Sequence, residues 1–140
     1  MEQPTSRRLL GATAVIGIGL LSDLLPSGPA PTYLLFGEQH VIVPTVWNIF
    51  ETLVIFAVGG FISRQGFMPV AVTIAVLSVL FSQYLLYQIA LPADQVNVIS
   101  TAVGNIPSII SALASAVVGA HLGEQLYSRK TSASFSAVEG

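Results

Sequence analysis

Four long apolar stretches dominate this chain and constrain what it can fold into. Each is close to the about 17–25 residues that an α-helix needs to cross about 30 Å of hydrocarbon. Backbone polar groups in lipid must pair within their own segment, and none of the stretches alternates apolar and polar residues as a barrel strand does. The sequence therefore predicts an all-α polytopic membrane protein, a compact bundle of four transmembrane helices. The predicted spans are Leu9–Leu25, Val43–Ile62, Phe67–Leu91 and Val96–Leu122.

The scarcity of charge supports the same conclusion. Only 9% of the 140 residues are charged, whereas soluble domains carry about 25%. The mean hydropathy is +0.77. A surface this poor in charge requires the lipid bilayer as its main partner. The length suits one domain, and we expect a transmembrane domain over residues 1–126 and a short disordered cytoplasmic tail over 127–140.

The basic residues predict the orientation. All five flank the predicted spans at three places: before the first span, between the second and third, and after the fourth. With four crossings these three places share one side of the membrane. Because positively charged loops are retained in the cytoplasm, both termini are predicted to be cytoplasmic, with the bacterial inner membrane as the location. The residues are Arg7, Arg8, Arg64, Arg129 and Lys130.

The region around the first span allows other interpretations. Arg7-Arg8 before an apolar run resembles a secretory signal peptide, but Pro29 and Pro31 flank the only small-residue cleavage site and favour an uncleaved helix. The connector Pro26–His40 holds three prolines and a small apolar patch. We expect an interfacial loop there, with a lid or re-entrant turn over a cavity as the alternative.

Glu51 is the most informative polar residue, because it falls inside the second span. An acid at membrane depth costs roughly 2.5–3.5 kcal/mol on insertion scales, so it must face protein or water. Asn48 and Thr52 extend a polar stripe beside it, and Gln83 of the third span lies at similar depth and is predicted to meet it. The group is either a proton- or cation-binding carboxylate in a pore or transporter, or a neutral carboxyl that hydrogen-bonds a neighbouring helix.

Small residues recur at four-residue spacing in the last span, which places them on one helix face. Such a face lets another backbone approach closely. The partner is either a helix of the same chain or one of a second copy. The predicted helix-packing face consists of Ser111, Ser115, Gly119 and Gly123.

The start of the same span contains Gly104-Asn105-Ile106-Pro107. Proline removes a backbone donor and clashes with the preceding turn. The helix is therefore either kinked here or begins near Ile106, and Asn105 is a candidate cap for the new helix. A broken helix at membrane depth is also typical of ion or substrate sites, so Asn105 joins the candidate polar site.

Several classes of function lack support in the sequence. There is no cysteine, and no metal-ligand spacing, phosphate loop or nucleophile elbow appears. The net charge is −2 and there is no basic tract, so the sequence does not indicate a nucleic-acid-binding surface. We therefore expect no enzyme, no cofactor and no bound metal.

Two hypotheses remain. The first is a small non-enzymatic integral membrane protein that acts as a helix-packing subunit or scaffold of a membrane assembly. It would associate through the last span, with itself as a homo-oligomer or with a larger membrane protein. The alternative is a homo-oligomeric channel or proton-coupled transporter that uses Glu51, Asn48 and Gln83. Four helices enclose little room for a solute, so transport would need at least a dimer.

Overall fold

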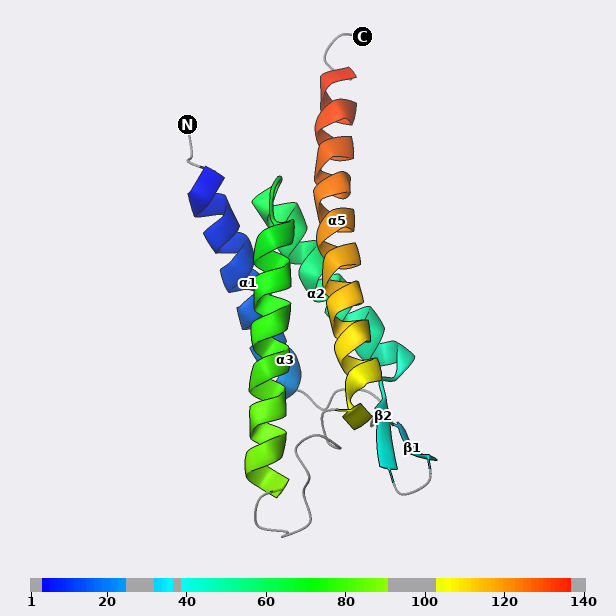
Figure 1. Cartoon of the computed structure of the whole chain (residues 1–140). Helices are drawn as coiled ribbons and strands as arrows, with labels where there is room; N and C mark the ends of the chain where they lie inside the picture. Colours follow the sequence, from blue (N-terminus) through cyan, green and yellow to red (C-terminus); the bar gives the residue numbers. More distant parts are fainter. Residues whose placement is uncertain (1–3, 25–31, 37–38, 91–102, 137–140) are drawn as a thin grey trace.

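A computed structural model describes residues 4–24, 32–36, 39–90 and 103–136 of the chain (Figure 1). The described part contains four long helices and one two-stranded hairpin. The elements are α1 (Pro4–Leu24), β1 (Thr32–Phe36), β2 (Gln39–Val43), α2 (Val46–Ser63), α3 (Met68–Ala90) and α5 (Ile106–Ser136).

Three of these helices are long and apolar enough to cross a membrane. Their apolar segments are Val46–Ser63, Met68–Leu85 and Ile106–Lys130, with mean hydropathies of 1.7, 1.8 and 1.6. The prediction of a helical membrane protein is confirmed to this extent. The helix α1 is not among the three, because Arg8 and Asp23 bound its apolar part.

A β-hairpin occupies part of the connector that was predicted to be an interfacial loop. Strands β1 and β2 pair antiparallel, from Thr32 opposite Val43 to Phe36 opposite Gln39. Both strands are rich in β-branched, aromatic and other large apolar residues, and a glycine lies between them in the sequence, which is a typical hairpin pattern. The membrane-crossing part is helical as predicted, but the connector is not an irregular loop.

The boundaries of α2 and α5 also differ from the predicted spans. Pro44 and the capping residue Thr45 delay the start of α2 to Val46. The helix α5 begins at Ile106, after a turn at Asn105. Val103 and Gly104, before this turn, are also helical, so the helix is interrupted at Asn105. The first residues of the longer version of the last span, 96–102, lie outside those described.

The end of α5 is the larger difference. The sequence predicts that the span ends at Leu122 and that a disordered tail follows from residue 127, whereas α5 continues to Ser136. Beyond Gly123 the chain has no proline or glycine until its final residue, and the first two turns there contain the strong helix formers Glu, Gln, Leu, Arg and Lys. The helix therefore extends past the apolar segment into polar sequence.

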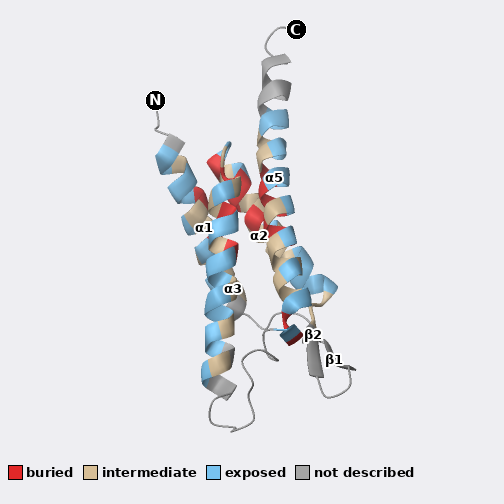
Figure 2. Cartoon of the chain, in the orientation of Figure 1, coloured by how far each residue is buried: buried red, intermediate tan, exposed pale blue. Residues whose placement is uncertain are grey.

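The helix α2 lies between α1 and α5, and its contact with α5 is the most extensive in the fold. The buried residues are small or aromatic, and most gather in the half of the bundle that holds the start of α1 and the middle of α5 (Figure 2). The fully buried aromatic residue is Phe67, at the turn between α2 and α3. The described hydrophobic core comprises Val15, Phe56, Phe67, Ala71, Ala75, Ala116 and Ala120.

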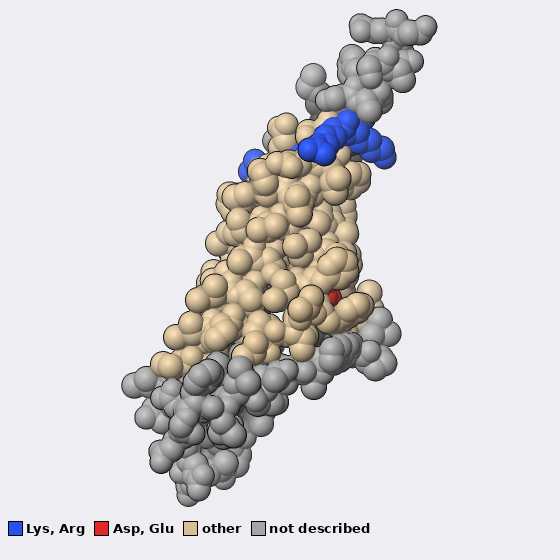
Figure 3. All heavy atoms as spheres, turned by 90° about the vertical axis from the view of Figure 1, so that its right-hand side faces the viewer, with Lys and Arg blue, Asp and Glu red and all other residues tan. Residues whose placement is uncertain are grey.

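The basic residues lie at one end of the bundle. The start of α1, the α2–α3 turn and the last turns of α5 share this end (Figure 1), and lysine and arginine side chains gather there (Figure 3). The Arg64 guanidinium lies 4.9 Å from the centroid of the Tyr127 ring, and the Lys130 amine lies 5.9 Å from that of Phe61. Segments far apart in the sequence therefore bring their positive charges together.

Candidate functional site

The helices α2 and α5 pack backbone to backbone over part of their length. A Cβ atom added to Gly119 would overlap the carbonyl oxygen of Leu53, and one added to Gly123 would overlap that of Ala57. In the other direction, a Cβ added to Gly60 would overlap a carbonyl oxygen of α5. We call this region the glycine contact. It places α2 of the same chain against half of the predicted helix-packing face.

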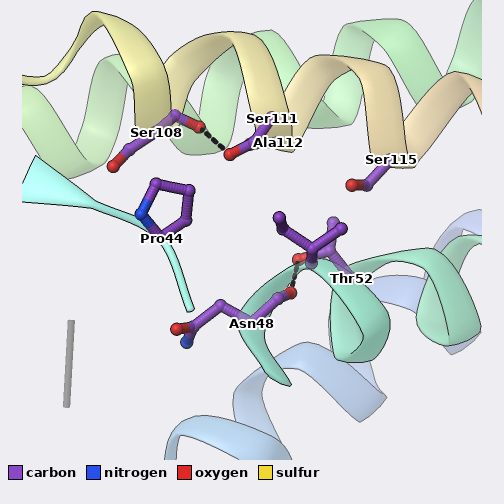
Figure 4. A pocket seen from close by; sticks show the side chains of 8 residues that line it. Pro44, Asn48, Thr52, Ser108, Ser111, Ala112 and Ser115 are labelled. Atoms are coloured by element: carbon purple, nitrogen blue, oxygen red, sulfur yellow. Dashed lines mark hydrogen bonds between the residues drawn. The ribbon is translucent and has the colours of Figure 1, made fainter. Parts of the chain in front are cut away.

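The other half of that face lines a pocket. Closer to the starts of both helices, α2 and α5 enclose a volume of about 260 Å³ (Figure 4). Ser111 and Ser115 of the predicted packing face meet Asn48 and Thr52 of the predicted polar stripe there. Two groups that the sequence analysis treated separately thus form one site. The lining residues are Pro44, Asn48, Ile49, Thr52, Ser108, Ser111, Ala112 and Ser115.

The hydroxyl groups of the pocket differ in their hydrogen bonding. Thr52 Oγ1 donates to the Asn48 carbonyl oxygen at 2.8 Å, and Ser111 Oγ donates to the Ser108 carbonyl oxygen at 3.0 Å. Ser115 is only 5% exposed as a residue, and its hydroxyl forms no hydrogen bond with the described residues. Figure 4 shows this hydroxyl directed into the pocket. No fully buried side-chain oxygen or nitrogen of the described residues lacks a hydrogen-bond partner, so the Ser115 hydroxyl is accessible from the pocket.

Asn48 has a structural role that the sequence analysis did not predict. Its side-chain Oδ1 accepts hydrogen bonds from the hydroxyl and the backbone N–H of Thr45, the latter at 3.3 Å. The Asn48 backbone N–H donates to Thr45 Oγ1 at 3.3 Å. This reciprocal arrangement is a capping box, which satisfies amides at the start of α2. The signal in the sequence was Thr45 followed three positions later by a residue with a side-chain carbonyl.

Glu51 does not line the pocket. Its side chain is half-buried beside the pocket residue Thr52, and no described residue forms a hydrogen bond or ion pair with it. The predicted contact between Glu51 and Gln83 is not found. The predicted polar network is thus divided between different places in the bundle.

Gln83 instead contacts Asn105. The Asn105 Nδ2 donates to Gln83 Oε1 at 3.3 Å, and Asn105 is 3% exposed. The Asn105 backbone carbonyl accepts from the Ile109 N–H at 3.0 Å and so begins the hydrogen bonding of α5. The candidate cap therefore acts through its backbone, while its side chain joins α5 to α3.

Glu124 is a second residue that the sequence analysis missed. Its Oε1 accepts a hydrogen bond of 2.6 Å from the backbone N–H of Phe67. Nearby, the Ser63 hydroxyl donates to the Arg7 carbonyl oxygen at 3.3 Å. Glu124 follows the predicted end of the last span at Leu122, and the sequence analysis assigned it no role. Because α5 continues to Ser136, Glu124 lies within this helix, and its side chain reaches the turn before α3.

Three helices that are long and apolar enough to cross a membrane indicate an α-helical membrane protein, and two of them, α2 and α5, make a close backbone contact beside a hydroxyl-lined pocket. Comparison with protein-family models, with curated proteins and with solved structures finds no match. Within the described ranges, no three His, Asp or Glu side chains are placed to hold a metal ion.

Proposed function

We propose that this chain is a small non-enzymatic integral membrane protein of the bacterial inner membrane that acts as a helix-packing subunit or scaffold of a membrane assembly. It spans the bilayer four times, with the start of α1 and the end of α5 in the cytoplasm. Its role is to present a helix surface to partner helices, either of a second copy or of a larger protein.

The position of α1 supports a fourth span. Added Cβ atoms at Gly11 of α1 and Gly59 of α2 would overlap atoms of the opposing helix, so α1 packs closely along α2. Its charged residues, Arg8 and Asp23, stand near its two ends. The gathering of basic side chains at one end of the bundle (Figure 3) supports the cytoplasmic assignment of that end, since positively charged segments are retained there.

The observation that carries the subunit role is the uncovered surface of α3. Only 11% of its apolar segment is buried, compared with 22% for α2 and 28% for α5. Ser78 and Ser82 are exposed one turn apart on α3, and each follows an exposed large apolar residue in the sequence, Leu77 and Phe81. A pair of small residues at four-residue spacing allows close approach of another transmembrane helix.

The glycine contact determines which face is available for a partner. The sequence analysis assigned association to the last span, but α2 covers Gly119 and Gly123 within the chain. The surface around Ser78 and Ser82 has no such cover among the described residues. We therefore assign association to α3 in place of α5.

Site-specific photo-crosslinking in native membranes tests this proposal. A benzophenone amino acid is placed at Leu77 or Phe81 of α3, which are 60% and 61% exposed. The matched control is Leu20 of α1, at 62% exposure. We expect a protein adduct from the two α3 positions, identified by mass spectrometry, and only lipid adducts from Leu20. Lipid adducts alone from all three positions would refute the subunit role.

A homo-oligomeric channel or proton-coupled transporter is the second candidate. It is favoured by Glu51, a half-buried carboxyl without a described partner. The close backbone packing at Gly119 and Gly123 leaves no passage between α2 and α5 beyond the pocket. The subunit proposal expects equal proton leak, read with a pH-sensitive dye, in liposomes containing wild type or the Glu51→Gln variant. Proton flux in wild type that the variant loses would support transport instead.

A further inference from the structure

The pocket between α2 and α5 is lined by residues that suit an uncharged ligand. None of the described residues that form it carries a charge: Pro44, Asn48, Ile49, Thr52, Ser108, Ser111, Ala112 and Ser115. An ion placed there would lose part of its hydration without gaining a counter-charge, which is unfavourable. The lining therefore disfavours phosphate, carboxylate and ammonium groups.

The hydrogen-bonding groups favour a ligand that donates. Thr52 and Ser111 already use their hydroxyl hydrogens on carbonyl oxygens of their own helices, at 2.8 and 3.0 Å. Each oxygen keeps lone pairs that accept hydrogen bonds. The Ser115 hydroxyl, which is accessible from the pocket and forms no hydrogen bond with the described residues, can donate as well as accept. A ligand with hydroxyl groups can form hydrogen bonds with all three side chains, those of Thr52, Ser111 and Ser115.

The remaining walls and the position of the pocket favour an amphiphile. Ile49, Ala112 and Pro44 provide apolar surface. Ser115 lies about 14 Å along α5 from its start, at about 1.5 Å per residue, so the pocket reaches well into the apolar part of the bundle. Phe50 and Ile110 are exposed and are sequence neighbours of the lining residues Ile49 and Ser111. Their side chains offer an apolar surface for the hydrocarbon chain of an amphiphile.

The size of the pocket limits what enters it. Its volume of about 260 Å³ is below the roughly 300–1,000 Å³ of sites for drug-sized ligands. A head group fits, whereas a complete lipid does not. We infer that this pocket binds the hydroxyl-bearing head group of an uncharged amphiphile, and the glycerol head of a monoacylglycerol has the required chemistry. Free glycerol shares that chemistry and is the other possible source. This inference does not depend on the proposed subunit role.

Native mass spectrometry of the purified full-length protein, released from detergent, tests the inference with three probes. The probes are monoolein, methyl oleate, which has the same chain without hydroxyl groups, and glycerol. We expect a single monoolein adduct and at least tenfold weaker retention of methyl oleate. Ser115→Ala should weaken monoolein binding about three- to tenfold, as expected for the loss of one hydrogen bond. Ser115→Leu should abolish it by filling the pocket.

Two controls isolate the pocket from general effects. Ala114→Leu adds the same side chain at the neighbouring exposed position, and Ser78→Ala removes an exposed hydroxyl from α3. Both should leave monoolein binding unchanged. Ser115→Ala removes only one oxygen, so it keeps the test decisive if Ser115→Leu does not fold.

The outcomes distinguish the sources. Retention of monoolein without glycerol supports a membrane lipid, and retention of both with similar affinity supports a free polyol. The inference is overturned if methyl oleate binds as tightly as monoolein, or if the Ser115 variants bind like wild type. It is also overturned if no probe is retained, because the pocket would then hold only water.

Discussion

The backbone N–H of Phe67 donates a 2.6 Å hydrogen bond to Glu124 Oε1, which joins the start of α3 to α5 across 57 positions of sequence. Phe67 is fully buried, and its ring lies in the close contact between α1 and α2. The turn that precedes it is irregular, with positive φ angles of 71° at Arg64 and 68° at Gly66. Glu124 therefore holds a tight turn in place from another helix.

Replacing Glu124 with leucine should destabilise the protein by about 1–3 kcal/mol, because it leaves a buried N–H group without an acceptor. Glu124→Gln retains an acceptor oxygen and should cost less. Thermal unfolding in detergent, followed by circular dichroism, measures the difference. The matched control is Gln125→Leu, which removes only an exposed hydrogen bond to His121. Equal losses in the Glu124→Leu and Gln125→Leu variants would contradict this role of Glu124.

The glycine contact predicts opposite effects for the same substitution at two positions. Gly123→Ala should destabilise the fold by about 1–3 kcal/mol, as overpacking does, since the new methyl group overlaps the backbone of Ala57. Gly17→Ala meets no atom within 4 Å and should be neutral or stabilising by up to about 1 kcal/mol through helix propensity. Chemical denaturation of both variants in the same detergent compares them. The packing argument fails if Gly123→Ala is as stable as wild type.

The hydrogen bond between Asn105 and Gln83 predicts coupling between α5 and α3. In a double-mutant cycle, Asn105→Ala and Gln83→Ala should be non-additive by about 0.6 kcal/mol and up to about 1.7 kcal/mol, the average and the maximum found for hydrogen bonds between membrane helices. Asn105→Ala combined with Thr73→Ala serves as the control, because the Thr73 hydroxyl donates to Pro69 of its own helix. That pair should be additive within about 0.5 kcal/mol. If the effects of Asn105→Ala and Gln83→Ala on the free energy of unfolding are additive, the two side chains are not coupled.

The proposed orientation predicts which residues an impermeant reagent reaches. The chain has no cysteine, so single cysteines can be introduced without background. Gln65→Cys, in the exposed α2–α3 turn, should react with a membrane-impermeant maleimide only after cells are permeabilised. Val46→Cys, at the 83% exposed start of α2, should react in intact cells. The reverse pattern would invert the topology.

Much of the helical architecture could be predicted from hydropathy alone. The spans of α2 and α3 agree with the predicted ranges within three residues at each end, because membrane insertion depends on the summed transfer free energy of consecutive residues. The structure departs from the predictions at the hairpin and at the end of α5, and both differences have local causes in the sequence. The strand-forming runs on either side of Gly37 are typical of a hairpin, and the composition after Gly123 favours a longer α5, but the sequence analysis expected an interfacial loop and a disordered tail.

The candidate site was predicted only in part. Four-residue spacing predicted that Ser111, Ser115, Gly119 and Gly123 share one face of a helix, and that Asn48 and Thr52 share one face of another. It did not predict that these faces meet, that Asn48 serves as a cap, or that Gln83 contacts Asn105 in place of Glu51. Similar depth in the membrane gives no information about the direction in which a side chain points around its helix.

The sequence by itself determined that three segments are helices suited to lipid and that positive charge flanks them at three places. Both are local properties, because the free energy of transferring a segment from water to hydrocarbon depends mainly on the residues of that segment. Only the tertiary structure decided that α2 covers the glycines of α5 and that a pocket remains beside Ser115. Lipid provides little hydrophobic force between helices, so the choice of partner depends on how backbones and side chains interlock in three dimensions.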